Sequence, residues 1–466
     1  MNLVFLGVLV YVVIQLTIGL VVSRHMTSED EYFLAGRRLK FGITMMTVFA
    51  TWFGAETCIG SAGAIYEEGL AGGRADPFGY ALCLFVMGAV FAYPLWKRKL
   101  TTLGDLFRER YSHRVEELAV ILMIPGSVMW AAAQIRAFGH VIAVSSDFSA
   151  GTGITMAAVV VITYTVAGGL LADAITDLIQ GIALIVGLVV LFIVGMNALG
   201  GFEAAMATVE PDRFRVFTGG GVTPLERIEA WAIPIFGSVV AQELVARTLA
   251  ARSANVARAA TISASGLYVC VGLLPAMLGL VGPSLVPGLE DPEQLLPAAA
   301  RELLPTFLYV LFAGALVSAI LSTVDSALLA ASALLSHNLI VPMLPGATDR
   351  TKVRTARVSV VVLGIVAYIL AWQAGGVYEL VEEASAFGSS GIFVVVVFAL
   401  FTNFGGRAAA FATLAVGGAS WIFGSYVLTL PYPYLLSLAA AFLTYLIMGW
   451  AERSPELVSA IRAIKE

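Results

Sequence analysis

Residues 305–335 read PTFLYVLFAGALVSAILSTVDSALLAASALL, an apolar run long enough to cross a membrane that carries one charge, Asp325. A carboxylate near the middle of a membrane helix costs about 3 kcal/mol on insertion scales, and chains that keep one usually use it to hold an ion, a proton or a substrate. Ser322, Asp325 and Ser326 share one helical face because they are spaced at i, i+3 and i+4. Thr323 lies beside them, so the face offers the oxygen ligands that small hard cations prefer.

The composition of the chain indicates an all-α polytopic membrane protein. Of its 466 residues, 59% are hydrophobic and 13% are charged, whereas soluble domains carry about 25% charged residues. A spanning helix needs about 20 apolar residues, and this length predicts about thirteen spans. These spans lie near 2–22, 41–66, 77–96, 115–144, 150–167, 171–198, 228–248, 258–282, 305–336, 353–373, 377–402, 407–426 and 432–450.

The first predicted span differs from a signal peptide, because it has no charged start and no small-residue cleavage site. The Lys and Arg residues of the loops, Arg247 counted among them, favour one side of the membrane by about four to one. This bias predicts an N-terminus outside and a C-terminus in the cytoplasm. The sequence contains no P-loop, no catalytic serine motif and no nucleic-acid motif. We therefore expect no enzyme activity and no nucleic-acid partner, but a small solute and the lipid bilayer, with the oligomeric state left open.

Two of the predicted spans contain helix breakers at corresponding places. Gly54, Gly60 and Gly63 interrupt the span at 41–66, and Pro234 and Gly237 interrupt the span at 228–248. Interrupted helices in both halves of a chain indicate an inverted-repeat transporter with its site near the membrane midplane, although glycine also serves in helix packing. The predicted organisation is 1–40 (first span and loop), 41–198 (repeat 1), 199–227 (outer loop), 228–402 (repeat 2) and 403–466 (two peripheral helices and a tail).

Acidic residues outnumber basic ones inside the predicted spans, which suggests that the protein handles cations. The acids are Glu56, Asp173, Asp177, Glu243, Asp325, Glu379, Glu382 and Glu383. Trp52 stands in the broken stretch, four residues before Glu56. A tryptophan face beside carboxylates can form a cation-π cage for an ammonium group, and ordinary packing is the alternative explanation.

Four segments, in order, resemble the sodium:solute symporter family. They are EYFLAGRRL at 31–39, AETCIGSAGAIYEEGL at 55–70, VAGGLLADAITDLIQ at 166–180 and LSTVDSALLAAS at 321–332. The resemblance implies a LeuT-like five-plus-five inverted repeat with extra flanking helices, embedded in the cell membrane. It also implies sodium, one or two ions, as the coupling ion.

The resemblance assigns site residues by position. The common sodium site of the family would use the carbonyl groups of Ala50, Phe53 and Ala319 with the hydroxyl groups of Ser322 and Thr323. A second sodium site, present in some members, would use Asp177, Ser322, Asp325 and Ser326. Members that carry sugars contact them at positions that match Glu56, Thr57 and Glu382.

Within the family, the segments ATWFG, PFGY, KRKLTTLGDLF and MWAAAQIRAFG are similar to the choline transporter branch, and the proline transporter branch is another neighbour. The aromatic cage of the choline branch would fall on Trp52, Tyr80 and Trp130. Its tryptophan on the seventh span is replaced here by Ala241, followed by Gln242 and Glu243. We therefore expect a nitrogen-containing solute, such as a polyamine, an amino acid or a betaine-like molecule, as readily as choline.

These observations predict a sodium-coupled symporter that imports a small cationic or zwitterionic solute by alternating access. A carrier of the same fold driven by protons, with Asp325, Asp177 or Glu56 titrating, is one alternative. A transporter-like sensor is another, and the roughly 16 residues after the last predicted span leave little room for its signalling domain.

Overall fold

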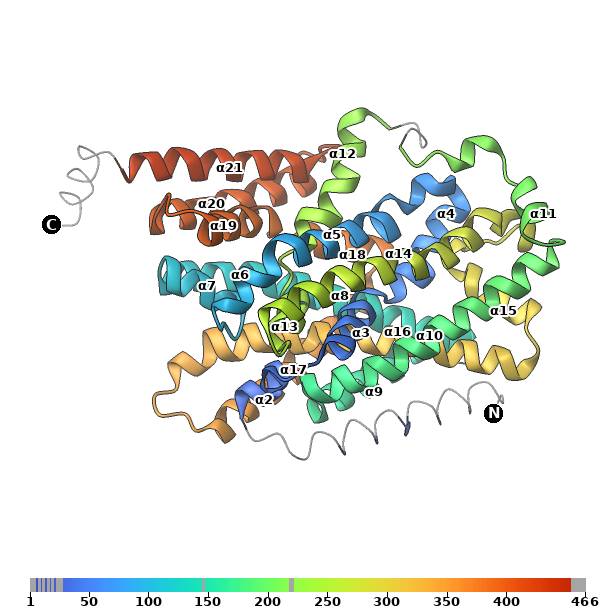
Figure 1. Ribbon diagram of the computed structural model, residues 1–466, viewed down its shortest axis with the longest axis horizontal. Helices are drawn as coiled ribbons and strands as arrows, with labels where there is room; N and C mark the ends of the chain where they lie inside the picture. The colour runs from blue at the N-terminus through green and yellow to red at the C-terminus, as the bar shows by residue number, and fades with distance from the viewer. Residues whose placement is uncertain are drawn as a thin grey trace.

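The computed structural model describes residues 28–453 except 145, 147 and 218–221, together with a few isolated residues before residue 22. The first predicted span and the tail after residue 453 lie outside the described residues. The described chain contains helices and no β-strand, and most of the helices run along the long axis of the molecule (Figure 1). Every predicted span after the first coincides with helical residues.

The first predicted repeat follows a short helix, α2 (Glu29–Leu34), whose N-terminus is capped by Ser28. The helices of this repeat are α3 (Phe41–Trp52), η2 (Glu56–Ser61), α4 (Ala62–Glu68), η3 (Gly69–Gly73), η4 (Arg74–Gly79), α5 (Tyr80–Val86), η5 (Met87–Phe91), α6 (Ala92–Lys97), α7 (Leu103–Arg110), α8 (His113–Val144), α9 (Ala150–Ala167) and α10 (Leu170–Ala198). The connection to the second repeat contains α11 (Phe202–Ala207) and η6 (Pro211–Phe214).

The second predicted repeat has a similar order of helices. It comprises α12 (Pro224–Ala232), η7 (Ile233–Gly237), α13 (Gln242–Ala250), α14 (Ala254–Leu285), η8 (Pro292–Gln294), α15 (Leu295–Leu303), α16 (Thr306–Ala333), η9 (Leu334–Ile340), η10 (Val341–Met343), α17 (Asp349–Gln373), α18 (Val377–Ala386) and α19 (Ser389–Phe401). The last described helices are α20 (Arg407–Ile422), η11 (Phe423–Val427) and α21 (Pro433–Ala451).

Apolar length identifies eight helical segments of the described chain that can cross a membrane, or ten if each of two bent helix pairs forms one span. The prediction of about thirteen spans and the predicted orientation therefore stay predictions. The large apolar side chains exposed on these helices, such as Ile182 on α10, Val361 on α17 and Phe442 on α21, suit contact with lipid.

Three spans are broken, and two of the breaks were predicted. α3 ends at Trp52, and Phe53 and Gly54 are not helical. A side chain at Gly54 would lie only 2.6 Å from the hydroxyl oxygen of Thr323, so the break brings this backbone directly against α16. η7 and α13 meet at a bend of 42°, and a further bend of 42° between α18 and α19 was not predicted. The bend between α18 and α19 contains Gly388, whose positive φ of 68° favours glycine.

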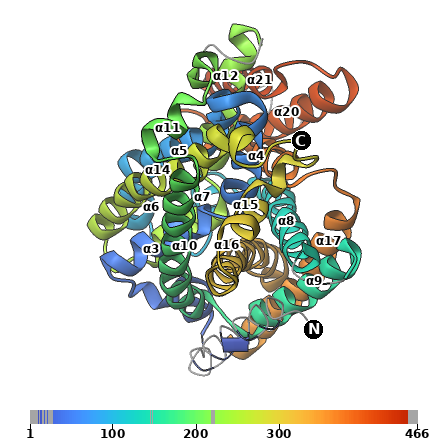
Figure 2. The same ribbon diagram turned by 90° about the vertical axis from the view of Figure 1, so that its right-hand side faces the viewer.

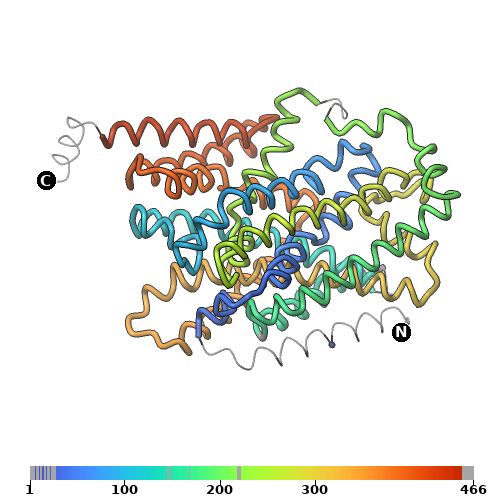
Figure 3. The backbone as a smooth tube through the Cα atoms, viewed as in Figure 1, coloured from blue at the N-terminus to red at the C-terminus, as the bar shows by residue number. Residues whose placement is uncertain are grey.

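The helix α16 packs among helices of the first predicted repeat. Viewed end-on in Figure 2, α16 lies between α10 and α3 on one side and α8 on the other, and it packs against all three helices. The tube in Figure 3 shows the same helices running side by side along the molecule. Residues 312–333 of α16 are all buried. Polar side chains of this segment must therefore find partners within the protein.

Candidate functional site

The break in α3 lies opposite the hydroxyl group of Thr323. Thr323 Oγ1 lies 3.4 Å from the carbonyl oxygen of Ala50 and 3.1 Å from that of Ala319. Phe53, whose backbone is not helical, completes the end of α3. Three oxygen atoms thus meet between α3 and α16, which is the ligand chemistry that a sodium ion requires.

Ser322, the other predicted hydroxyl ligand, faces α10. Its Oγ donates a hydrogen bond of 2.6 Å to Asp177, and Thr47 Oγ1 donates to the other oxygen of the same carboxylate. Ser322 therefore links the oxygen atoms around Thr323 to a buried negative charge. The residues of the first predicted sodium site fit a small cation on these grounds.

A buried arginine occupies part of the second predicted sodium set. Arg247 on α13 is 0% exposed, so its predicted place in a cytoplasmic loop is wrong. Its guanidinium forms an ion pair with Asp173 and donates to Ser326 Oγ. Its Nε donates to Thr51 Oγ1 at 2.7 Å. The apolar run before Arg247 resembles a complete span, but the bend at residues 239–241 carries α13 and its charge into the protein.

Asp325, the most conspicuous charge in the sequence, has no hydrogen-bond partner for either carboxylate oxygen among the described residues. It is fully buried, and one oxygen lies near Gly168, which caps the end of α9. The four residues of the second predicted sodium set differ in their partners. Asp177 and Ser322 contact each other, Ser326 contacts Arg247, and the carboxylate of Asp325 has no hydrogen bond to the other three. We refer to Asp173, Asp177, Arg247, Ser322, Asp325 and Ser326 as the central cluster.

The three predicted aromatic residues come together. The ring of Trp130 lies 5.2 Å from that of Trp52 and 5.8 Å from that of Tyr80, measured between centroids. The hydroxyl group of Tyr80 is 2.9 Å from Ser385 Oγ on α18. Trp52, Tyr80 and Trp130 therefore form one buried aromatic wall, and α8 contributes its central member.

A small cavity lies on one side of this wall. It has a volume of about 40 Å³ and is bounded by α8, by the break before α13 and by the break between α18 and α19; its polar lining residues are Ser127, Ser238, Gln242, Glu243, Ser385 and Ser389. Glu243 is 5% exposed, and its Oε1 has no hydrogen-bond partner among the described residues. A cavity of this size holds water but no organic solute, so a solute can enter only after the surrounding helices move.

Glu56 and Thr57 do not line this cavity and are hydrogen-bonded to other side chains. Gln134 donates 2.7 Å to Glu56 Oε2, while Thr57 Oγ1 donates 2.7 Å to Asp76. Tyr268 also donates to Asp76, at 3.0 Å. Gln134, Asp76 and Tyr268 were not predicted as site residues. Their only signal in the sequence is a polar residue type within or beside an apolar segment, and Asp76 stands in a turn-like DPFG stretch between two spans.

Two other residues predicted to contact the solute, Glu382 and Gln242, differ in their position relative to the cavity. Glu382 is exposed on α18 and does not line the cavity. Gln242 does line the cavity, but its Oε1 accepts a hydrogen bond of 2.8 Å from the backbone of Leu103. Gln242 thereby connects the cavity to the start of α7.

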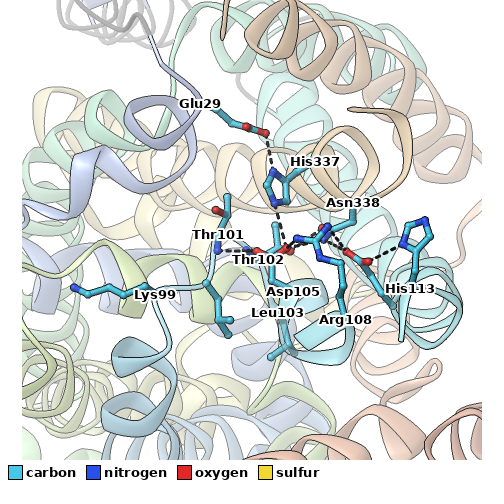
Figure 4. Close-up of polar contacts among 12 residues, drawn as sticks. Glu29, Lys99, Thr101, Thr102, Leu103, Asp105, Arg108, His113, His337 and Asn338 are labelled. Carbon is cyan, nitrogen blue, oxygen red and sulfur yellow. Dashed lines mark hydrogen bonds and ion pairs between the residues drawn. The ribbon is translucent and has the colours of Figure 1, made fainter. Parts of the chain in front are cut away.

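A second polar cluster, drawn in Figure 4, includes residues of α7. In Figure 1, α7 lies with α6 at one end of the molecule, the end predicted to be cytoplasmic. His337 contacts Glu29 at 2.8 Å and Asp105 at 3.2 Å through its two ring nitrogens. Both nitrogens can donate only if the imidazole is positively charged. Asn338 donates to Glu116 at 2.8 Å, and Arg108 donates to Asp105 at 2.7 Å. We refer to Glu29, Asp105, Arg108, Glu116, His337 and Asn338 as the end cluster.

The end cluster joins four helices and stabilises its acids as carboxylates. Burial raises the pKa of Asp105, but the hydrogen bond and charge of His337 and the amides of Thr101 and Thr102 outweigh burial, and the pKa lies below its ordinary value. Burial also raises the pKa of Glu29, and His337 and Lys352 together lower it below its ordinary value. The end cluster therefore holds α2, α7, α8 and η9 together.

The fold and the site define a multi-pass membrane transporter, with paired broken helices around a polar centre. Residues 32–417 match the model of the "Sodium:solute symporter family". This chain belongs to that family. The family consists of transporters rather than enzymes, as the sequence analysis expected.

Among curated relatives, the chain is 27% identical over 372 residues to the high-affinity choline transporter 1 of Drosophila melanogaster, a match over 76% of this chain and 59% of that protein. It is 28% identical to the high affinity choline transporter 1 of Homo sapiens, over 76% of this chain and 63% of that protein. The match thus spans less than two thirds of these choline transporters. The sodium/proline symporter of Staphylococcus aureus is 27% identical over 89% of this chain and 84% of its own length.

Solved structures share the fold. A sodium-coupled sialic acid symporter in a substrate-bound outward-open state superposes with a TM-score of 0.81 at 17% identity, over 96% of both chains. A nucleobase-cation-symport-1 family transporter with bound bromovinylhydantoin gives a TM-score of 0.66 at 16% identity, over 93% of this chain and 96% of that chain. The LeuT-like all-helical architecture predicted from the sequence is thereby confirmed.

Proposed function

We propose that this protein is a sodium-coupled symporter that imports a small, nitrogen-containing solute across the cell membrane. The observation that carries this proposal is the convergence of Thr323 Oγ1 with the carbonyl oxygens of Ala50 and Ala319 at the break in α3. Family membership supports the same function, because the relatives include transporters named for sodium.

Sodium would bind between the two repeats. Its ligands would be the carbonyl groups of Ala50, Phe53 and Ala319 and the hydroxyl groups of Ser322 and Thr323, with Asp177 supplying negative charge behind Ser322. Binding there joins α3 to α16 and so favours one arrangement of the repeats. The coupling is reciprocal, since sodium must raise solute affinity by the same factor by which solute raises sodium affinity.

The solute would bind at the cavity beside Trp130. Glu243 offers an unpaired carboxylate oxygen there, and Ser127, Ser238 and Ser385 offer hydroxyl groups. A carboxylate beside an aromatic face attracts a positively charged nitrogen. Because the cavity now has room only for water, solute binding requires an open state, and closure around the solute followed by opening on the other side constitutes alternating access.

One observation favours a second candidate, a proton-coupled carrier of the same fold. Asp325 is a buried carboxylate without a hydrogen-bond partner among the described residues, and such a group is expensive to keep charged. In that case a proton on Asp325 would take the role of the sodium ion.

A binding screen tests the proposal. Purified protein is heated with choline, proline, a betaine, a polyamine and an uncharged sugar, each in sodium chloride and in potassium chloride. We expect nitrogen-containing solutes to raise the melting temperature in sodium and much less in potassium. A best ligand without nitrogen would contradict the solute class, and equal shifts in both salts would contradict sodium coupling.

A further inference from the structure

Arg247 lies among the side chains that would form a second sodium site. It comes from α13, the half-helix that follows the break in the seventh predicted span. Its guanidinium contacts Asp173 on α10 and Ser326 on α16, and its Nε donates to Thr51 on α3. One side chain thus bridges helices of both predicted repeats.

The position of the guanidinium opposes the binding of a sodium ion at Ser326. Ser326 Oγ accepts a hydrogen bond from Arg247 and donates one of 2.7 Å to the carbonyl oxygen of Ser322. A hydroxyl oxygen has two lone pairs; the guanidinium of Arg247 takes one of them, and the hydroxyl oxygen of Thr51 lies 3.2 Å from the same atom. A second cation at this oxygen would also be repelled by the guanidinium in a buried, weakly screened environment.

Two of the three acids of the central cluster are compensated without a second sodium ion. Asp173, Asp177 and Asp325 are its acids, and Arg247 is the only arginine or lysine that forms an ion pair with any of them in the part of the chain that the structure describes. The guanidinium compensates Asp173. A sodium ion at Ser322 and Thr323 compensates Asp177, which is hydrogen-bonded to Ser322.

We infer that the guanidinium of Arg247 takes the place of a second sodium ion, so that the protein binds one sodium ion per transport cycle. This inference rests on the sodium coupling proposed above. A tethered cation cannot leave with the cargo, so Arg247 stabilises the acidic centre in every state of the cycle without drawing on the sodium gradient. The free energy available for concentrating the solute is then the free energy released when one sodium ion moves down its gradient.

The test counts sodium ions. Radioactive sodium is titrated against the purified full-length protein in a potassium background, and bound ions per protein are measured at equilibrium. We expect one site and a Hill coefficient near one. Two sites in the wild type, which would place an ion between Asp177 and Asp325, would overturn the inference alone. Zero sites would overturn both the inference and the proposed sodium coupling.

Two variants test whether the guanidinium of Arg247 determines the number of bound sodium ions. Arg247→Gln removes the tethered charge, and we expect bound sodium to rise from one ion to two. The paired variant Asp173→Asn with Arg247→Gln removes both charges and is expected to return to one ion. A count that stays at one in Arg247→Gln, in protein whose elution profile matches the wild type, would contradict the inference. If Arg247→Gln does not fold, the wild-type count remains decisive.

Discussion

The central cluster and the end cluster are both polar groups between helices, but they balance their charges differently. The central cluster holds three acids against one arginine, and all of its members are buried. The end cluster holds three acids against Arg108 and His337, and two neighbouring bases add to them, since Lys352 pairs with Glu29 and His113 contacts Glu116. The side chains of Arg108 and His113 are 43% and 51% exposed, so this end of the cluster reaches the surface. Its acids Glu29 and Asp105 share the ring of His337.

The difference indicates what each cluster does. A cluster that only fastens helices can pair every acid with a base, and in the end cluster each acid contacts at least one base. A cluster that receives a mobile cation must keep negative charge or oxygen ligands in reserve. The central cluster does so at Asp177 and Asp325. The following predictions change one cluster at a time, beginning with the largest expected effect.

Breaking the ion pair of the central cluster should cause the largest loss in the free energy of unfolding. Asp173→Asn leaves the Arg247 guanidinium buried without its carboxylate, and removal of one partner from a buried pair costs about 3–5 kcal/mol. Thermal unfolding in detergent measures the loss. Adding Arg247→Gln should recover much of it, and a double variant as unstable as Asp173→Asn would show that the pair itself is not the cause.

Removing the hydroxyl ligands should abolish sodium-driven transport. Ser322→Ala with Thr323→Ala deletes two ligands of a charged ion, about 1.5–3 kcal/mol each, which corresponds to a loss of sodium affinity of roughly 100-fold or more. Sodium titration of solute uptake measures it. Ser332→Ala is the control, since Ser332 is buried on the same helix and bonds to Ala356. Unchanged sodium affinity in the double variant would remove Ser322 and Thr323 from the site.

Neutralising the carboxylate in the cavity should weaken binding of cationic solutes. Glu243→Gln keeps the shape of the side chain but removes its charge, and we expect roughly a tenfold loss of affinity for a cationic solute, about 1.4 kcal/mol. Glu382→Gln, an exposed acid outside the cavity, should have little effect. Competition binding with the best solute of the screen compares the two. Equal effects would mean that Glu243 does not contact the solute.

The end cluster should be less sensitive to loss of one charge. Asp105→Asn keeps an oxygen acceptor for the amides of Thr101 and Thr102, and neighbouring charges are partly solvated. We expect a loss of about 1–2 kcal/mol in stability. The melting temperature of this variant should lie above that of Asp173→Asn, and the reverse order would contradict the comparison of the two clusters.

Acidification should weaken the end cluster slightly. The pKa values of Asp105 and Glu29 are lowered in the folded protein, so their stabilisation is complete above the ordinary carboxyl pKa of about 4. It is lost as the pH falls through the lowered folded-state values. Unfolding measured between pH 6 and pH 3 (the range is roughly that of carboxyl titration) should show a smaller pH-dependent loss in Asp105→Asn than in the wild type. An identical loss would exclude Asp105 as a contributor.

Much of the fold could be predicted, because apolar length determines which segments cross a membrane. The breaks near Gly54 and Pro234 could also be predicted from helix-breaking residues. The bend at Phe387 and Gly388 was missed, since one glycine inside an apolar run is common in membrane helices. Whether this glycine bends the helix depends on how α18 and α19 pack around the cavity.

The site was predicted in part. Resemblance correctly brought Trp52, Tyr80 and Trp130 to one place, and their roles stay proposals. Arg247 could not be placed, because a charge at the end of an apolar run indicates a loop unless the bend before it is known. The partnerships of Asp76 and Gln134 were also out of reach, since they join residues of different helices whose register no local pattern reveals.

The measurement that tests the central claim most directly is solute accumulation in proteoliposomes under opposed gradients. The best solute of the screen is supplied once with an inward sodium gradient at equal pH and once with an inward proton gradient in potassium. We predict accumulation above equilibrium with the sodium gradient alone. Accumulation driven by the proton gradient in the absence of sodium would contradict the account and favour a proton on Asp325.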